Sequence, residues 1–351
     1  MRPKLIFVFL VFFSQIKAQL TEQNSIAKQN YFAELKTNVT EFKKDFYPNY
    51  VKLYSLPEKS FITKIDAARK NLDAVLNKYK SKFDNYFVQE QQKEIKYYFD
   101  KLLIDYPLTH DNYIGKTSQT ASKISQKLKG NIADFNKPEL LNNSDFTNYL
   151  KAFFHYQINL ELKNPVYKNS DNQELDAVWK LIPRFISNPK CREFWQCDYL
   201  YNHIDNNGIK DIESIYANFK STCNDTVCLT KVKAIYSDDS IGGQGHLTKI
   251  YKTVGSFNLD IHLFLPDSLW SDNKKPVIIY FHGGSWSEGK PDWFFYECKS
   301  DAKRGWVACA VEYRTSGRYG TLPFDAVMDA KSAIRWLRQH ASEYNMERIK
   351  L

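Results

Sequence analysis

Glycine is scarce in the first two thirds of the chain, and this scarcity limits the folds expected there. Most of the 13 glycines stand at or after Gly242. The long stretch before it carries apolar residues at helical spacing, as in Ile65, Leu72 and Leu76, with Lys, Asp and Asn between them. Such spacing is typical of amphipathic helices. We therefore expect an all-helical region over residues 19–238, whose function the pattern does not reveal.

The sequence also lacks the features that mark nucleic-acid, metal and redox proteins. The formal net charge is +9, but the lysines are scattered among Asn, Asp and Glu, which argues against a nucleic-acid partner. No C-x-x-C pair occurs and no paired histidines follow the cysteines, so we expect no metal and no cofactor. After the first residues no apolar run is long enough to span a bilayer, which predicts no transmembrane segment.

The first 18 residues have the pattern of a secretory signal peptide. Arg2 and Lys4 are positive, Leu5–Phe13 is an unbroken apolar run, and Ala18 offers a small residue before a possible cleavage at Gln19. The alternative is a membrane anchor, but the apolar run is too short for a span of about 20 residues. We expect a secreted or periplasmic protein.

Four cysteines fit an exported protein. Cys191 and Cys197 lie close together, as do Cys223 and Cys228. In an oxidising compartment these four predict two disulfides, with the three possible connectivities left open. Cys309, inside an apolar run, is interpreted as a buried small hydrophobic residue.

The pattern changes at the glycine-rich linker 241–245 to short strands that alternate with helices. Residues 249–254 and 259–265 predict a β-hairpin, and 276–281 and 306–313 are continuous apolar runs, typical of strands buried on both faces. The segments 291–304 and 324–344 predict helices, and 348–351 begins a further strand. This alternation predicts an α/β fold, with a doubly wound, mostly parallel sheet.

The sharpest motif follows the first buried strand, where His282, Gly283, Gly284, Ser285 and Trp286 stand in succession. Acyl-transfer enzymes stabilise a developing oxyanion with fixed donors, and backbone N–H groups in a glycine-containing turn can supply them. Glycine lets the backbone approach a substrate and adopt positive φ. The alternative is an ordinary turn that happens to contain two glycines.

Together, PVIIYFHGGSWSEG, GWVACAVEYR and FDAVMDAKSAIRWLRQHASEYNMERIKL resemble the α/β-hydrolase carboxylesterases and lipases of the HGG type. The resemblance spans residues 249–351. It implies that Gly283, Gly284 and Ser285 supply oxyanion-hole amides, that His282 supports the turn, and that Trp286 lines the substrate pocket. Those enzymes often have glycine where this chain has Ser285, but the backbone N–H is retained.

Two further residues, Arg314 and Asp329, match positions of the same family, and we interpret them as structural, tying strand to helix. The helical region resembles the helical segments that precede thioredoxin-like domains of exported proteins, in its general sequence pattern and without a shared motif.

The catalytic triad is not expected in this chain. In the α/β-hydrolase fold the nucleophile sits on a G-x-S-x-G turn directly after a strand, followed by Asp and then His. Residues 348–351 fit that strand, so we interpret residues 239–351 as the N-terminal half of the domain and the chain as a fragment. Ser287 resembles such an elbow serine, but it follows the wrong strand and is not expected to be the nucleophile.

The sequence thus predicts an exported serine hydrolase of carboxylic esters, with a small-molecule or carbohydrate-linked ester as substrate. Three alternatives remain: an amidase or formamidase of the same fold, a prolyl-type peptidase, and a non-catalytic binding protein built on a hydrolase scaffold.

Overall fold

A computed structural model describes residues 25–115, 122–242, 245–267, 269 and 273–347. The predicted signal peptide and the predicted strand 348–351 lie outside these residues. The chain forms two compact units, 1–156 and 157–351. This division does not coincide with the predicted boundary at 238/239, and the functional domains proposed from the sequence remain predictions.

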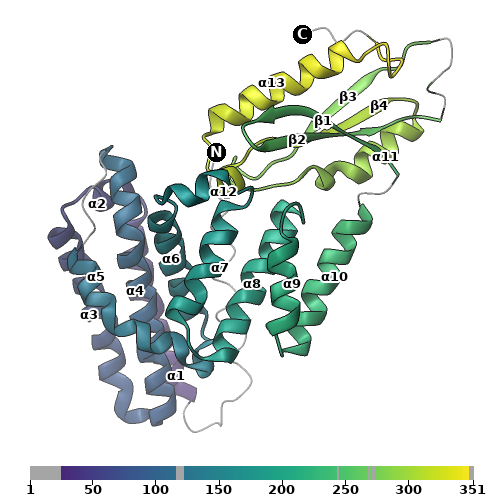
Figure 1. The fold of residues 1–351 in the computed structure, drawn as a ribbon. Coiled ribbons are helices and arrows are strands. Elements are labelled where there is room, and N and C mark those ends of the chain that lie inside the picture. The colour runs from purple at the N-terminus through teal and green to yellow at the C-terminus, as the bar shows by residue number, and fades with distance from the viewer. Residues whose placement is uncertain (1–24, 116–121, 243–244, 268, 270–272, 348–351) are drawn as a thin grey trace. The chain divides into compact units, whose positions relative to one another are not determined.

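The first unit is helical, as its apolar stripes predict (Figure 1). Its α-helices are α1 (Ser25–Phe46), α2 (Tyr50–Tyr54), α3 (Glu58–Tyr79), α4 (Asn85–Ile114), α5 (Ser122–Leu128) and the start of α6 (Ser144–Glu161), and its 3-10 helices are η4 (Lys80–Lys82), η5 (Lys129–Asn136) and η6 (Pro138–Leu140). On α3 the buried side chains include Ile65, Leu72 and Leu76, so the predicted stripe faces the core.

Helix α4 is longer than the sequence predicts. The pattern indicates an end near Pro107, but the helix continues through Pro107 to Gly115, which caps it with φ +64°. Proline removes one backbone donor and strains the preceding turn, yet packing of an apolar face can outweigh this local cost. Pro107 is itself buried, as are Leu103 and Ile104 beside it, so tertiary contacts hold the helix intact.

The second unit begins with further helices. They are α7 (Gln173–Phe185), α8 (Pro189–Asn207), α9 (Glu213–Thr222) and α10 (Thr226–Gly242), preceded by the 3-10 helix η7 (Pro165–Asn169). Helix α8 starts where Asn188 accepts a hydrogen bond from the Cys191 N–H through its side chain. Cys197, Cys223 and Cys228 are free thiols, so the two predicted disulfides are not formed in this structure. Cys309 is fully buried, as predicted.

The sheet of the second unit has four strands among the described residues. They are β1 (Leu247–Val254), β2 (Phe257–Phe264), β3 (Val277–Phe281) and β4 (Val307–Val311), in the order β1-β2-β4-β3. The predicted hairpin is confirmed as β1–β2, but both β1–β2 and β2–β4 are antiparallel and only β3–β4 is parallel. The expected mostly parallel sheet is therefore, in the described part, a small mixed sheet, because the hairpin contributes half of its strands.

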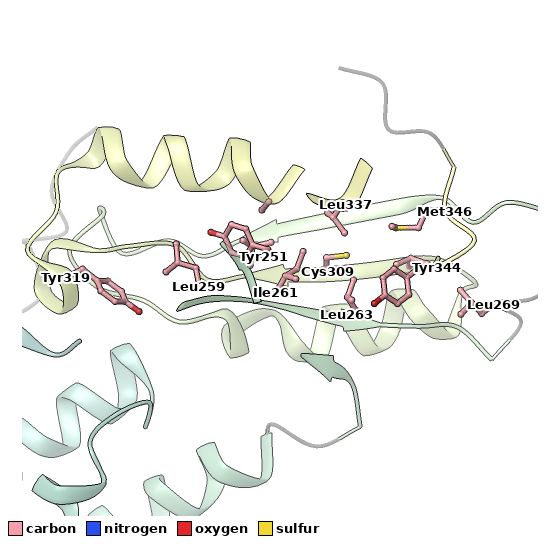
Figure 2. Close-up of a cluster of buried hydrophobic side chains, with 13 residues drawn as sticks. Tyr251, Leu259, Ile261, Leu263, Leu269, Cys309, Tyr319, Leu337, Tyr344 and Met346 are labelled. Carbon is pink, nitrogen blue, oxygen red and sulfur yellow. The ribbon is translucent and has the colours of Figure 1, made fainter. Parts of the chain in front are cut away.

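Helices cover both faces of this sheet (Figure 1). Helix α13 (Pro323–Gln339) lies on one face, and η8 (Pro291–Phe294) with α11 (Phe295–Lys303) lies on the other. On the α13 side, Leu259, Ile261 and Leu263 alternate along β2 and pack with Cys309 and Leu337 (Figure 2). Two-sided cover of this kind is how α/β folds bury a sheet.

The two strands predicted to be buried on both faces differ in the structure. Every residue of β4 is buried, as expected. Every residue of β3 is only partly buried, because in the described part of the chain its outer edge meets only an isolated bridge, Lys275 with Met346. No helix of the described residues is long and apolar enough to cross a membrane.

Candidate functional site

The turn that follows β3 has an unusual backbone. Gly284 has φ +104°, and the next two residues, Ser285 and Trp286, have φ +54° and +62°. Two consecutive non-glycine residues in the left-handed region are rare and cost free energy, and such strain gathers at functional sites. Successive backbone N–H groups in a turn of this kind form a concave donor surface for anions.

A second feature of this turn is the state of its backbone donors. Within the described part of the chain, the backbone N–H groups of Gly284, Ser285 and Trp286 donate no hydrogen bond. Ser285 and Trp286 are exposed and Gly284 is partly so, so solvent or a ligand can reach the turn. Three adjacent free donors on a fixed backbone are what an oxyanion hole needs.

Two carbonyls of the same turn accept hydrogen bonds. Gly284 O accepts from Ser287 N at 3.0 Å and from the Ser287 hydroxyl at 2.9 Å. Trp286 O accepts from Ser316 N at 2.8 Å, which ties the turn to α12 (Ser316–Tyr319). The acceptors thus hold the turn, while its donors remain free.

Glycine is needed at two positions of the motif and tolerated at a third. A Cβ atom at Gly284 would lie 2.0 Å from Glu288 O, and one at Gly289 would lie 2.2 Å from His282 Nδ1. A Cβ atom at Gly283 would meet nothing within 4 Å. Gly283 therefore borders open space beside the turn, where a substrate could approach.

His282 packs under the turn as a neutral ring. Its Nδ1 lies 2.9 Å from Gly283 O, so this nitrogen carries the proton. Burial lowers the pKa of His282 to about 4, which keeps the imidazole uncharged near pH 7. Its buried Nε2 has no hydrogen-bond partner among the described residues.

Tyr313, which the sequence analysis did not single out, fixes the same turn from β4. Its ring stacks on His282 with centroids 4.0 Å apart, and its hydroxyl donates to His282 O at 2.6 Å. The segment GWVACAVEYR contains this tyrosine, but only the parallel pairing of β3 with β4 shows what it contacts.

The structure also places the remaining predicted residues. Trp286 projects with 46% of its surface exposed, next to the free donors. Ser287 is exposed and donates to Gly284 O, with no His or carboxylate partner among the described contacts, as expected for a serine that is not activated.

Arg314 is bidentate to Asp329, with Nε–Oδ2 2.8 Å and Nη2–Oδ1 2.9 Å. The structural interpretation of this pair is confirmed, because it joins the end of β4 to α13.

A buried ionic cluster stands beside the turn. Glu312 accepts from Arg318 at 2.9 Å, from Lys210 at 2.9 Å and from the Tyr319 hydroxyl at 2.8 Å. Burial by itself raises the pKa of Glu312, but the charges of Arg318 and Lys210 outweigh it and lower the pKa to about 2. Glu312 is therefore ionised at neutral pH. No group of three or more potential metal ligands is found among the described residues.

Comparison with known proteins adds a family resemblance for the last quarter of the chain. Residues 259–351 match the family model described as BD-FAE. The probable carboxylic ester hydrolase LipM of Mycobacterium tuberculosis is 37% identical over 70 residues, which cover 20% of this chain and 16% of that protein. Probable carboxylesterase 4, mitochondrial, of Arabidopsis thaliana is 34% identical over 94 residues, 24% of either chain.

Among solved structures, the esterase Est2 of Thermogutta terrifontis is 38% identical over 30% of this chain and 38% of its own, with a TM-score of 0.29. The chain spans only 16% and 24% of the length of the first two curated relatives. The family and sequence matches support a carboxylic-ester hydrolase of the α/β-hydrolase type for the C-terminal segment.

Proposed function

We propose that the protein is an exported serine hydrolase of carboxylic esters and that the turn 283–286 is its oxyanion hole. The observation that carries the proposal is the row of free N–H groups at Gly284, Ser285 and Trp286, held on a left-handed turn. The similarity to carboxylic ester hydrolases supports the same reaction class.

In the proposed reaction a serine hydroxyl attacks the ester carbonyl while a histidine takes its proton. The carbonyl oxygen becomes an oxyanion and receives hydrogen bonds from the turn. The histidine then returns the proton to the leaving alcohol, and water repeats the sequence on the acyl-enzyme. We place the serine, aspartate and histidine after Leu351, in the chain order of the α/β-hydrolase fold, so the coding sequence beyond that residue is the first thing to read.

The test uses enzyme expressed from the complete coding sequence. Gly284→Ala should lower kcat on p-nitrophenyl esters by about 10²–10³-fold, the effect of losing one oxyanion donor, because the added Cβ collides with Glu288 O. Gly130→Ala is the matched control, since a Cβ there meets nothing within 4 Å. Full activity of Gly284→Ala would show that the turn is not the oxyanion hole.

The same enzyme separates the alternative functions. Faster turnover of p-nitroanilides than of esters would favour an amidase, and no turnover of either, with a Gly or Ala at the elbow, would favour a non-catalytic binding protein. Fractionation of cells and N-terminal sequencing test export, for which a mature N-terminus at Gln19 is expected. An uncleaved protein that stays in the cytoplasm would contradict it.

A further inference from the structure

The end of helix α8 meets the segment that follows the proposed oxyanion turn. Three successive carbonyls, those of Ile204, Asp205 and Asn206, accept hydrogen bonds from it. The donors are Lys290 Nζ to Ile204 O at 3.1 Å, Trp293 Nε1 to Asp205 O at 3.4 Å and Gly289 N to Asn206 O at 2.8 Å. The last carbonyls of a helix carry its negative dipole end, so they suit an ammonium and N–H donors. Ile204 O also accepts from Gly208 N, at 3.0 Å.

Gly289 links this contact to the turn itself. It has φ +119°, and its α-carbon packs so closely on His282 and Gly283 O that a Cβ would lie 2.2 and 2.6 Å from them. A shift of α8 would move Gly289, and a shift of Gly289 would press on His282 and Gly283. A single hydrogen bond, from Gly289 N to Asn206 O, thus connects the end of α8 to the residue that packs against the turn.

Lys210, which lies just after α8, makes a second set of contacts with the sheet. Lys210 lies 2.9 Å from Glu312 and 3.2 Å from Asp260, and its Nζ donates to Asn258 O at 2.6 Å. Glu312 directly precedes Tyr313, the residue that holds the carbonyls of the turn. The segment 204–210 therefore connects the turn after β3 with the carboxyl end of β4.

We propose that the segment 204–210 is a positioning element for the oxyanion turn, and that Lys290, which binds this segment, and Lys210, which lies in it, are the positioning residues. Helix α8 is then a part of the hydrolase site instead of belonging to a separate binding domain. This inference rests on the proposed ester-hydrolase function, but its structural half can be measured without activity.

The experiment compares Lys290→Met and Lys210→Met with Lys220→Met in the enzyme expressed from the complete coding sequence. Lys220 is an exposed residue of the same unit, whose ammonium lies over the Tyr216 ring. Both test variants should lower kcat on p-nitrophenyl esters at least about tenfold, the scale of one lost charge-assisted hydrogen bond, with little change in KM. Lys290→Arg should restore most of the rate.

Hydrogen–deuterium exchange of residues 287–289, whose N–H groups donate hydrogen bonds, gives the second readout. Exchange should become faster in both test variants and stay unchanged in Lys220→Met. Unchanged exchange in Lys290→Met and Lys210→Met would overturn the proposal, whatever their activity. An equal fall in kcat for Lys220→Met would overturn it as well. If wild-type enzyme lacks esterase activity while exchange responds as expected, the proposed function fails and the positioning contact stands.

Discussion

Ser285 combines a left-handed backbone with an accessible N–H donor in the turn after β3. Its N–H is free and its backbone is left-handed, a conformation that serine adopts at a cost and glycine adopts readily. The similar esterases often have glycine at this position, and the sequence analysis expected the backbone N–H to be retained with serine. The structure indicates that the side chain is exposed and leaves the donor accessible.

We expect Ser285→Gly to keep the turn and the esterase activity, because the N–H and the left-handed backbone are both retained. Ser285→Val should destabilise the protein by about 1–2 kcal/mol, because a β-branched residue resists positive φ. Urea unfolding of the two variants beside wild type measures the difference. Equal stability of Ser285→Val and wild type would argue against the left-handed turn.

Glu312 predicts an acid-sensitive contact. Its pKa in the folded protein, about 2, lies below the ordinary glutamate value of 4.5, so its ionised form stabilises the fold. That contribution is fully present above about pH 4.5 and is lost as the pH falls toward 2.

In Glu312→Gln, which keeps the shape and removes the charge, Lys210 and Arg318 lose their buried counter-ion, and we expect a loss of about 3–5 kcal/mol at pH 7. The difference from wild type should shrink as the pH is lowered from 5 to 3. Urea titrations across that range check this expectation, and a difference that is constant with pH would contradict it.

At the scale of elements, the attachment of α13 to the sheet depends on one buried carboxylate. Asp329 is fully buried and accepts from Arg314 and from Lys252, the latter at 2.6 Å. It therefore joins α13 to both β4 and β1. Asp325, one turn earlier, has a 38% exposed side chain and a longer contact with Arg314, at 3.5 Å.

The two aspartates form a matched pair for mutation. Asp329→Asn should destabilise the second unit by about 3–5 kcal/mol, since it leaves two cations without their buried partner. The loss from Asp325→Asn through its ion pair should be below about 1 kcal/mol, because exposed ion pairs contribute little. Thermal and urea unfolding compare them, and similar losses in both variants would refute the ranking.

At the scale of the whole molecule, the helices that precede the sheet do not all belong to the same compact unit. Helices α7 and α8 belong to the unit that contains the sheet. Gln173 donates to Tyr319 O at 3.2 Å, and Arg318 donates to Asn172 at 3.1 Å. The sequence analysis set residues 19–238 apart from the hydrolase segment as one helical region, but these contacts and the unit boundary join α7 and α8 to the part that contains the sheet.

A fragment of residues 19–238 tests the point. Without Tyr319, Arg318 and Glu312, we expect faster hydrogen–deuterium exchange over 173–207 than in the whole chain. Residues 25–115 should exchange as before and serve as the internal control. Equal protection of residues 173–207 in the fragment and in the whole chain would support the domain boundary predicted near residue 238.

The local features of this protein can be predicted from its sequence. Apolar spacing identified the buried stripe of α3, the β1–β2 hairpin and the covering helices of the sheet, because side-chain periodicity reflects which face of an element is buried. The glycine pattern located the turn at residues 282–286, since close approach and positive φ restrict residue choice within a few positions.

Other features required the three-dimensional contacts, because local patterns do not encode them. The continuation of α4 through Pro107, the edge position of β3 and the support of the turn by Tyr313 and α8 all depend on contacts between residues far apart in the chain. Long-range packing can outweigh local propensity, and a partner such as Asn206 O for Gly289 N leaves no trace in composition or spacing, because any residue supplies a backbone carbonyl.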